Sequence, residues 1–357
     1  MNRGTHLPDA RGTEGVNARQ GMTHALEIVS TGHAYPHERV GNDDFFARCR
    51  FPLPADRAGL VESTRMKNRY WCGPAENTWT LARTAVERAL GDAELRQEID
   101  VVLAVSSTTV AYLNPPEAER PGNGDLSSLV IRDALRRTDC VGVDLKSCAC
   151  AGFVRALQVM DGLLNDPNRR AGLIVCVEQT SRLAVAESNR SAFCFILGDA
   201  AGAMVLRRGA PRQDDGPEVG LLDHTGHTDA TGLGLIAFGD DGESLVMRGA
   251  AAGRATLEAM ASSARKLLRR NGLGPGDVDW LLPVQGHWDG VRSLAEELRW
   301  PADKVLWSGD TTGFSGSASI PACLSEQIER KVVRRGDLIL SPAAGAGING
   351  GAALYRY

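Results

Sequence analysis

The sequence predicts a layered α/β fold made of two similarly built halves. The 357 residues are enough to bury a large core. Short aliphatic segments recur along the chain, and each is followed by a segment whose apolar residues have helical spacing. Such alternation is typical of sheets covered by helices. Hydrophobic residues make up 43% of the chain and charged residues 24%, which is usual for a soluble enzyme.

The expected strands and helices follow from these patterns. Short runs rich in Val, Leu and Ile predict buried strands at 101–105, 173–177, 280–282 and 338–340. Apolar residues three and four positions apart predict helices at 78–90, 126–135, 152–164, 255–270 and 291–298.

A break in the pattern separates the two halves. Residues 209–217 combine Gly, Pro and charged residues, a composition typical of an exposed connection. The first residues are rich in Gly, Arg, Asn and Asp and poor in large apolar groups. We therefore expect a flexible leader over 1–24, an N-terminal half over 25–209 and a C-terminal half over 220–357.

Composition also excludes several classes of protein. The net charge of -4 and the lack of any Lys/Arg block give no reason to expect a nucleic-acid partner. No apolar run approaches the roughly eighteen residues of a membrane helix, so we expect a cytoplasmic protein without membrane contact. The eight cysteines have no repeated spacing, so we expect reduced thiols. Cys148 and Cys150 lack the second pair of ligands that a zinc site needs, so no metal is expected.

The most informative segment spans residues 143–153, where an apolar strand passes through small residues directly into a helix. Cys150 lies at the start of that helix. Free N–H groups and the positive end of the helix dipole lower a thiol pKa there and can stabilise an anion. Position alone leaves a second interpretation open, in which Cys150 is a packed core thiol. Cys148 lies on the strand side and is expected to line the pocket or the core.

Five motifs in order carry a family resemblance. Cys150-Ala-Gly-Phe followed by an aliphatic helix resembles the nucleophile motif of ketoacyl-acyl carrier protein synthase III enzymes. Four further segments resemble that family's strand with Gly-Asp-Gly-Ala-Gly, its histidine strand, its helix start after the catalytic asparagine and its C-terminal glycine loop; they lie at 197–206, 279–283, 317–321 and 345–351.

The resemblance implies a fold, a chemistry and partners. The fold would be thiolase-like, with two fused βαβαβαββ halves in a five-layered αβαβα arrangement, and the protein a homodimer. Cys150 would carry an acyl group as a thioester, taken from acyl-CoA or from a phosphopantetheinyl acyl carrier protein, with no permanently bound cofactor. The backbone N–H groups of Cys150 and Ala346 would hold the oxyanion.

The family that the chain resembles uses a catalytic set of Cys, His and Asn. The sequence departs from that family at the His and Asn positions. An alignment without gaps places Val284 at the histidine position and Phe314 at the asparagine position, and neither side chain donates a hydrogen bond. An alignment with small insertions instead makes His287 the histidine and places Asp310 at the asparagine position. The sequence does not choose between the two.

These departures favour acyl transfer over condensation. A carboxylate from Asp310 in the pocket would repel a malonyl carboxylate and its enolate, but it could orient His287 to deprotonate a hydroxyl, amine or thiol acceptor. Relatives in antibiotic pathways that resemble this pattern acylate small molecules or carrier proteins. We therefore predict a specialised-metabolism acyltransferase with Cys150, His287 and Asp310 as catalytic residues.

Two other functions stay open: a decarboxylating condensing enzyme and a non-catalytic partner subunit of a synthase. Four residues are expected to contact the substrates: Phe314, Val284, Trp288 and Arg65. The long, proline-rich loop over 111–124 suggests either an altered acyl pocket or a tolerated surface insertion.

Overall fold

The computed structural model describes most of the chain after the expected leader. The described residues are 26–49, 53, 56–91, 93–108, 125–146, 149–185, 192–209, 219–238 and 245–357. The leader (1–24), Cys148, the loop over 111–124 and nearly all of the connection over 209–217 lie outside them.

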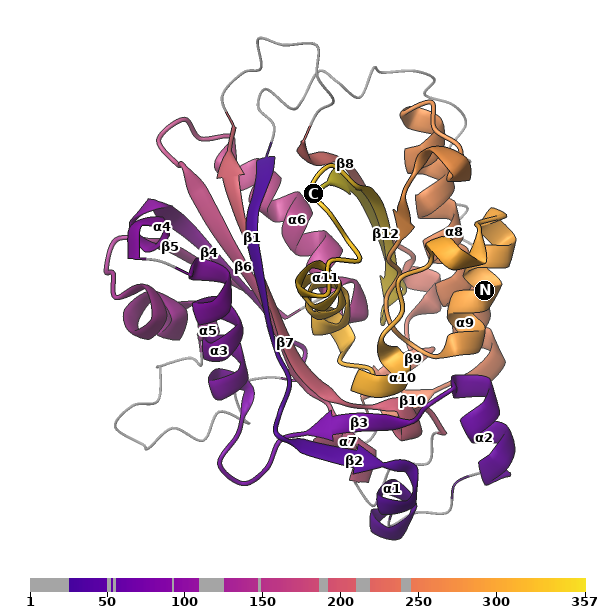
Figure 1. The fold of residues 1–357 in the computed structure, drawn as a ribbon. Helices are drawn as coiled ribbons and strands as arrows, with labels where there is room; N and C mark the ends of the chain where they lie inside the picture. Colours follow the sequence, from indigo (N-terminus) through magenta and orange to yellow (C-terminus); the bar gives the residue numbers. More distant parts are fainter. Residues whose placement is uncertain are drawn as a thin grey trace, which may run out of the picture.

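Within these described ranges, nine strands form one sheet in the order β11-β12-β13-β8-β1-β7-β6-β4-β5 (Figure 1). Five strands come from the part before residue 209: β1 (Leu26–Ala34), β4 (Ile99–Val105), β5 (Val141–Leu145), β6 (Ala171–Gln179) and β7 (Asp199–Arg208). Four come from the part after residue 219: β8 (Gly220–Thr228), β11 (Trp280–Leu281), β12 (Leu338–Gly345) and β13 (Asn349–Arg356).

The two parts of the sheet meet at a single antiparallel pair, Leu26 of β1 with Leu221 of β8. In the first part, β5, β4 and β6 are parallel, whereas β7 and β1 are antiparallel to their neighbours. In the second part β11 is parallel to β12, and β13 is antiparallel to both β12 and β8. Parallel strands that are buried on both faces read as continuous aliphatic runs, which is why β4 and β6 were predictable.

Helices cover and separate these two parts in five layers (Figure 1). One outer layer contains α3 (Thr78–Leu90), α4 (Ala93–Glu98) and α5 (Leu126–Leu129), which continues as the π-helical η4 (Val130–Leu135). The middle layer contains α6 (Gly152–Leu164) and α11 (Ser319–Glu329). The other outer layer contains α8 (Gly249–Arg270) and α9 (Trp288–Leu298). Because α6 packs against strands of both parts, its N-terminus lies between them.

Shorter elements complete the described chain. Two small sheets lie outside the main one, β2 (Glu38–Gly41) with β3 (Asn68–Trp71) and β9 (Ile236–Phe238) with β10 (Leu245–Met247). The short helices are α1 (Asn42–Arg48), α2 (Arg57–Thr64), α7 (Ser181–Val185) and α10 (Gly309–Thr312). Single turns are η5 (Ala149–Ala151), η6 (Ala192–Ile196), η7 (Ala230–Gly232), η8 (Pro275–Asp277), η9 (Ala302–Lys304) and η10 (Gly316–Ala318).

The sequence-based α/β prediction is confirmed, and α3 and α6 have the predicted bounds. Helix α8 starts at Gly249, six residues before the predicted start, because Gly and Ala dominate its first turns and leave little apolar periodicity to read. Helix α9 starts at Trp288, directly after His287, which caps it.

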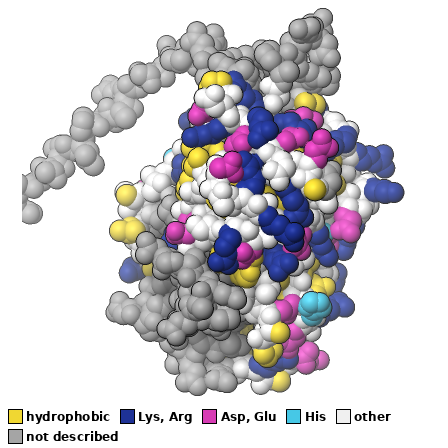
Figure 2. Space-filling model, turned by 90° about the vertical axis from the view of Figure 1, so that its left-hand side faces the viewer, with side chains coloured by type: hydrophobic (Ala, Val, Ile, Leu, Met, Phe, Trp, Pro, Cys, Tyr) yellow, Lys and Arg dark blue, Asp and Glu magenta, His cyan; other side chains and the backbone are white. Residues whose placement is uncertain are grey.

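One outer face carries many Lys and Arg side chains among acidic ones (Figure 2). Near β5 these charges are paired: Arg137 contacts Asp139 at 2.9 Å and Arg170 contacts Asp100 at 3.1 Å. Their charges therefore partly cancel. Among the described helices, none is long and apolar enough to cross a membrane.

Candidate active site

Cys150 lies in the turn η5, directly before α6, where the chain enters the space between the two parts of the sheet. The turn is tight: Ala149 has a left-handed φ of 40°. Gly152 follows because a Cβ there would lie 2.6 Å from Cγ1 of Val105 and 3.0 Å from Cβ of Ser317. Strand β4 and the turn η10 therefore press against the helix start, and the side chain of Cys150 faces a cavity.

The surroundings of Cys150 favour the neutral thiol. Burial raises the pKa of Cys150 to about 12, the negative charge of Glu178 adds to this, and a backbone hydrogen bond opposes it. The pKa of Cys150 is therefore raised, whereas the sequence predicted that it would be lowered. The helix N-terminus would lower the thiol pKa, but this effect is outweighed because the thiol is desolvated and lies near a carboxylate.

That carboxylate, Glu178, is a residue that the sequence analysis missed. It lies near the end of β6, whose nine residues are all buried. Its oxygens accept hydrogen bonds from the hydroxyls of Ser107, Thr108 and Ser317 at 2.9, 2.8 and 2.6 Å. A single acid in a continuous aliphatic strand was the available signal, because a buried charge needs a structural or functional reason.

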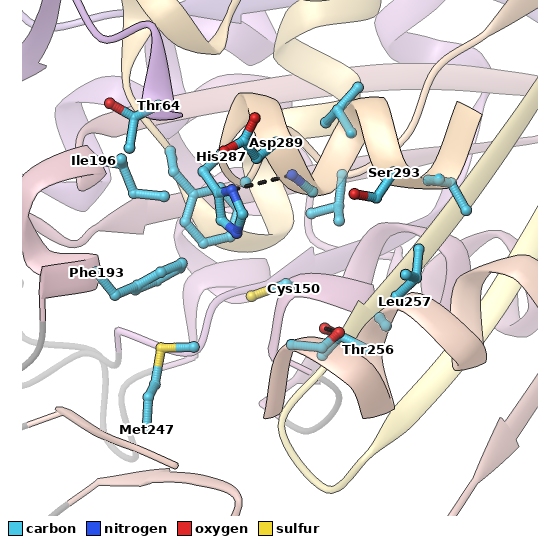
Figure 3. A pocket seen from close by; sticks show the side chains of 18 of the residues that line it. Thr64, Cys150, Phe193, Ile196, Met247, Thr256, Leu257, His287, Asp289 and Ser293 are labelled. Atoms are coloured by element: carbon cyan, nitrogen blue, oxygen red, sulfur yellow. Dashed lines mark hydrogen bonds between the residues drawn. The ribbon is translucent and has the colours of Figure 1, made fainter. Parts of the chain in front are cut away.

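His287 lies across the cavity from Cys150, and both side chains point into it (Figure 3). The imidazole Nδ1 accepts a hydrogen bond of 3.1 Å from the backbone N–H of Gly290 and so caps α9. In the neutral ring the proton therefore resides on Nε2. Although the ring is exposed to the cavity, desolvation lowers the pKa of His287, and the charge of Asp289 opposes this.

The loop before His287 is held by a buried glutamine. Gln285 is 1% exposed; its Nε2 donates to the carbonyl of Pro283 at 2.8 Å, and its Oε1 accepts the Ser308 N–H at 2.9 Å. The loop therefore has a fixed course from β11 to α9, and Val284 on it lines the cavity at 8% exposure.

Phe314 also lines the cavity and is buried. Its main chain is held independently of its ring: its N–H donates to the Ile196 carbonyl at 2.7 Å, and its carbonyl accepts the Gly198 N–H at 3.0 Å. Its ring packs edge-on against Phe193, with centroids 5.4 Å apart. Val284 and Phe314, the two residues of the alignment without gaps, therefore both line the cavity of Cys150, as does His287 of the other alignment.

Asp310 is not brought to this cavity. It lies on the short helix α10, and its carboxylate binds the ammonium of Lys67 at 2.7 Å. Asp310 is absent from the described residues that line the cavity, whereas His287 is among them. A Cys-His-Asp set with Asp310 would need a rearrangement of α10.

The other expected residues lie at the borders of the site. The guanidinium of Arg65 stacks over Trp288, 4.1 Å from the ring centroid, and so joins the end of α2 to the start of α9. In the glycine loop, Ala344 and Gly345 line the cavity, and Ala346 follows them. The backbone donor expected at Ala346 stays a prediction.

The cavity itself has a volume of about 780 Å³, within the range of small-molecule sites. Its lining combines apolar side chains with polar ones from α8 and α9 (Figure 3). The lining includes Phe193, Ile196, Met247, Leu257, Thr256, Ser293, Asp289 and Arg254. No cluster of three or more His, Cys, Asp or Glu that could hold a metal ion occurs within the described ranges.

Comparison with known proteins identifies a family for two segments of the chain. Residues 143–229 match the family described as 3-oxoacyl-(acyl-carrier-protein) synthase III, and residues 268–357 match the C-terminal domain of the same synthase. These segments include Cys150 and both Val284 and Phe314.

Relatives extend this similarity over most of the chain. A β-ketoacyl-(acyl-carrier-protein) synthase III of Rhizorhabdus wittichii is 29% identical over 337 residues, covering 92% of this chain and 98% of the relative. The corresponding protein of Methylococcus capsulatus is 27% identical over 346 residues, covering 94% and 100%.

Solved structures give the same picture. The 3-oxoacyl-(acyl-carrier-protein) synthase III of Aquifex aeolicus superposes with a TM-score of 0.80 at 27% identity, covering 93% of this chain and 100% of that one. A priming β-ketosynthase from a polyketide biosynthetic pathway superposes with a TM-score of 0.78 at 25% identity, covering 93% and 96%. The expected thiolase-like fold is thereby confirmed.

Proposed function

Because this chain belongs to the ketoacyl-acyl carrier protein synthase III-like proteins of the thiolase superfamily, we propose that it is an acyltransferase that works through an acyl thioester on Cys150. The donor is an acyl-CoA or an acyl carrier protein. The acceptor is a hydroxyl, amine or thiol of a small molecule in specialised metabolism.

One observation supports acyl transfer over condensation: Val284 and Phe314, which the alignment without gaps places at the family's histidine and asparagine positions, line the cavity of Cys150. Condensation needs donors for the enolate that forms when a malonyl thioester loses CO2. Removing one such donor typically slows a reaction about 10²- to 10³-fold. Val and Phe supply none, so an enolate would meet no side-chain donor at these two positions.

Acyl transfer makes smaller demands on these two positions. In the first step the Sγ of Cys150 bonds to the acyl carbon, the donor's C–S bond breaks, and the Cys150 proton passes to the leaving thiolate, which departs as a thiol. In the second step the acceptor attacks the acyl carbon, the bond to Sγ breaks, and the acceptor's proton returns to Cys150. Both steps need an oxyanion site, which backbone N–H groups at Cys150 and the glycine loop can form.

The geometry supports a donor role for His287 in place of the base role expected from the sequence. Its Nδ1 is occupied by the Gly290 N–H, so a neutral ring offers Nε2–H to the cavity. That group can donate to the thioester oxygen as charge develops there. Asp310 has no part in this proposal because it pairs with Lys67 outside the cavity.

Intact-protein mass spectrometry tests the proposal. The native chain and Cys150→Ala are incubated with a panel of acyl-CoAs, including malonyl-CoA. Alcohols and amines are then added while released CO2 is measured. We expect an adduct that requires Cys150 and that is discharged by an acceptor without release of CO2.

A second candidate is a decarboxylating condensing enzyme, which is favoured by the names of the relatives. Release of CO2 from malonyl-CoA, coupled to a new carbon–carbon bond, would establish it and overturn acyl transfer. The third candidate is a non-catalytic partner subunit, and absence of an adduct with every donor would favour it.

We also propose a homodimer. Strand β5 is the last strand of the sheet on its side, and Val141 on it is 39% exposed. Such an edge can pair with a second copy of the chain. Sedimentation of the purified protein at several concentrations tests this assembly.

A further inference from the structure

Glu178 is a buried acid that the proposed reaction leaves without a role. It is 0% exposed and lies near the carboxyl end of β6. Besides the three hydroxyls, the backbone N–H groups of Ser107 and Thr108 donate to its oxygens at 3.0 and 2.9 Å. Five donors thus face the carboxyl group, an arrangement that suits the ionised form, which only accepts hydrogen bonds.

These donors belong to segments that are far apart in the sequence. Ser107 and Thr108 follow β4, Glu178 belongs to β6, and Ser317 lies in the turn η10 before α11. Gly316 in that turn has φ of 50°, and a Cβ there would lie 3.3 Å from Cγ of Glu178. The turn is therefore folded closely over the acid.

The same turn touches the start of the nucleophile helix. A Cβ at Gly152 would lie 3.0 Å from Cβ of Ser317, whose hydroxyl donates to Glu178 at 2.6 Å. Gly152 is two residues after Cys150. Glu178, Ser317 and the helix start therefore form one packed unit behind the nucleophile.

The charged groups around Cys150 include an acid whose effect the ring of His287 does not offset. Among the groups that face it, Glu178 is the acid that raises the pKa of the thiol, after burial itself. His287, Asp289 and Arg254 line the same cavity from α9 and α8. Desolvation lowers the pKa of His287, so no positive charge on this ring offsets Glu178 near neutral pH.

We propose that Glu178 is a positioning residue for Cys150: its carboxylate ties β4, β6 and η10 together behind the nucleophile, and its charge adds to burial in keeping Cys150 a neutral thiol until a thioester enters. A neutral thiol resists oxidation and alkylation, because the thiolate is the reactive form. The role rests on the proposed acylation of Cys150, but it can be tested without any acyl donor.

The test compares two variants by the rate at which iodoacetamide alkylates Cys150 near neutral pH, with peptide mapping to assign the label. Glu178→Gln removes the charge and should lower the thiol pKa by on the order of one unit. Because nucleophilicity falls with the pKa, the net gain in rate is about threefold.

Ser317→Ala removes one donor but keeps the acid. More of the carboxylate's charge is then left uncompensated, so alkylation should become slower, by less than Glu178→Gln accelerates it. Both variants weaken the contact between Ser317 and Glu178, since Ser317→Ala removes the hydroxyl and Glu178→Gln leaves only an uncharged acceptor oxygen. If that contact only stiffened the turn, both rates would change in the same direction, and this result would overturn the proposal.

Asp144→Asn is the matched control. Asp144 at β5 accepts hydrogen bonds from the Leu126 N–H at 2.8 Å and from the hydroxyl of Ser127, and it is not among the charges that shift the pKa of Cys150. Its rate should equal that of the native chain. An unchanged or slower rate in a folded Glu178→Gln contradicts the proposal. If that variant does not fold, a faster rate in Ser317→Ala contradicts it.

The two proposals fail separately. Alkylation rates that follow the expected pattern, together with no acyl adduct from any donor, would leave the role of Glu178 intact and refute the acyltransferase. Adducts that form normally while Glu178→Gln leaves the alkylation rate unchanged would do the reverse.

Discussion

The cavity has two sides that are built from different kinds of groups. On the side of Cys150, the nucleophile begins a helix, glycines allow close packing, and a buried acid is bound by five donors. A second part of the cavity's lining, formed by Val284, Phe314 and Phe193, is apolar. The first side depends largely on main-chain geometry, and the second depends on side chains alone.

This difference indicates which chemistry can persist when a sequence diverges. A backbone N–H stays in place whatever side chain its residue carries, so a site for a thioester oxyanion survives substitution. A histidine or asparagine donor is lost by a single replacement. The proposed thioester chemistry at Cys150 therefore depends less on these two side chains than condensation would.

The largest effect is expected when the nucleophile itself is removed. Cys150→Ala should abolish the acyl adduct, because no other described thiol lies at a helix start in the cavity. Cys323→Ala is the control, since Cys323 is a buried thiol of α11 and 1% exposed. Intact mass after incubation with acyl-CoA measures both. An adduct that survives Cys150→Ala would place the nucleophile elsewhere.

The second prediction concerns polar groups introduced into the apolar part of the lining. The double change Val284→His and Phe314→Asn should raise the release of CO2 from malonyl-CoA by about 10²-fold or more, because it returns donors to the enolate. Phe314→Leu, which keeps the wall apolar, should show no such gain. Native-like unfolding must be verified, since removing a buried Phe costs about 3–5 kcal/mol. A folded double variant without decarboxylation would mean that other groups set the reaction.

The third prediction separates the two roles of His287. Both His287→Ala and His287→Asn should slow transfer of the acyl group by about 10²-fold, because both remove the Nε2–H donor. His287→Ala should also lose about 1 kcal/mol of stability with the helix cap, whereas Asn is itself a good cap. Single-turnover transfer and denaturant unfolding give the two values. Full activity in the Asn variant would rule out a chemical role for the imidazole.

The smallest expected effect is the pH dependence of that cap. Because the pKa of His287 is lowered in the folded state, its neutral form contributes stability that is present above the unfolded pKa of about 6.5. This contribution is lost as the pH falls through the lowered value. His33 behaves likewise, since burial lowers its pKa too. The difference between the native chain and His287→Asn, measured by unfolding from about pH 8 to about pH 5, isolates His287. A difference that does not vary with pH would contradict the assigned cap.

Much of the fold was readable because its elements are strongly patterned. Strands β4 and β6 are continuous aliphatic runs, and α3 and α6 have regular apolar spacing bounded by Asn77 and Gly91 and by the turn at Cys150. The start of α8 was missed because Gly and Ala there give no pattern.

The site was only partly readable because its contacts join distant segments. Asp310 lies where an alignment could place it near His287, yet its ion pair with Lys67 is formed across 243 positions of sequence. Glu178 lies 139 positions from Ser317. Neither partnership has a signal in local sequence, so the role of Asp310 could not be judged and Glu178 passed unnoticed.

The main chain of Phe314 is anchored at both its N–H and its carbonyl by residues 196 and 198. These two hydrogen bonds do not depend on the ring, which adds its packing against Phe193. At a position of this kind an amide or an aromatic side chain can be present while the main chain keeps its course. A change of reaction within this fold can then begin with the substitution of one residue, without a change in the fold itself.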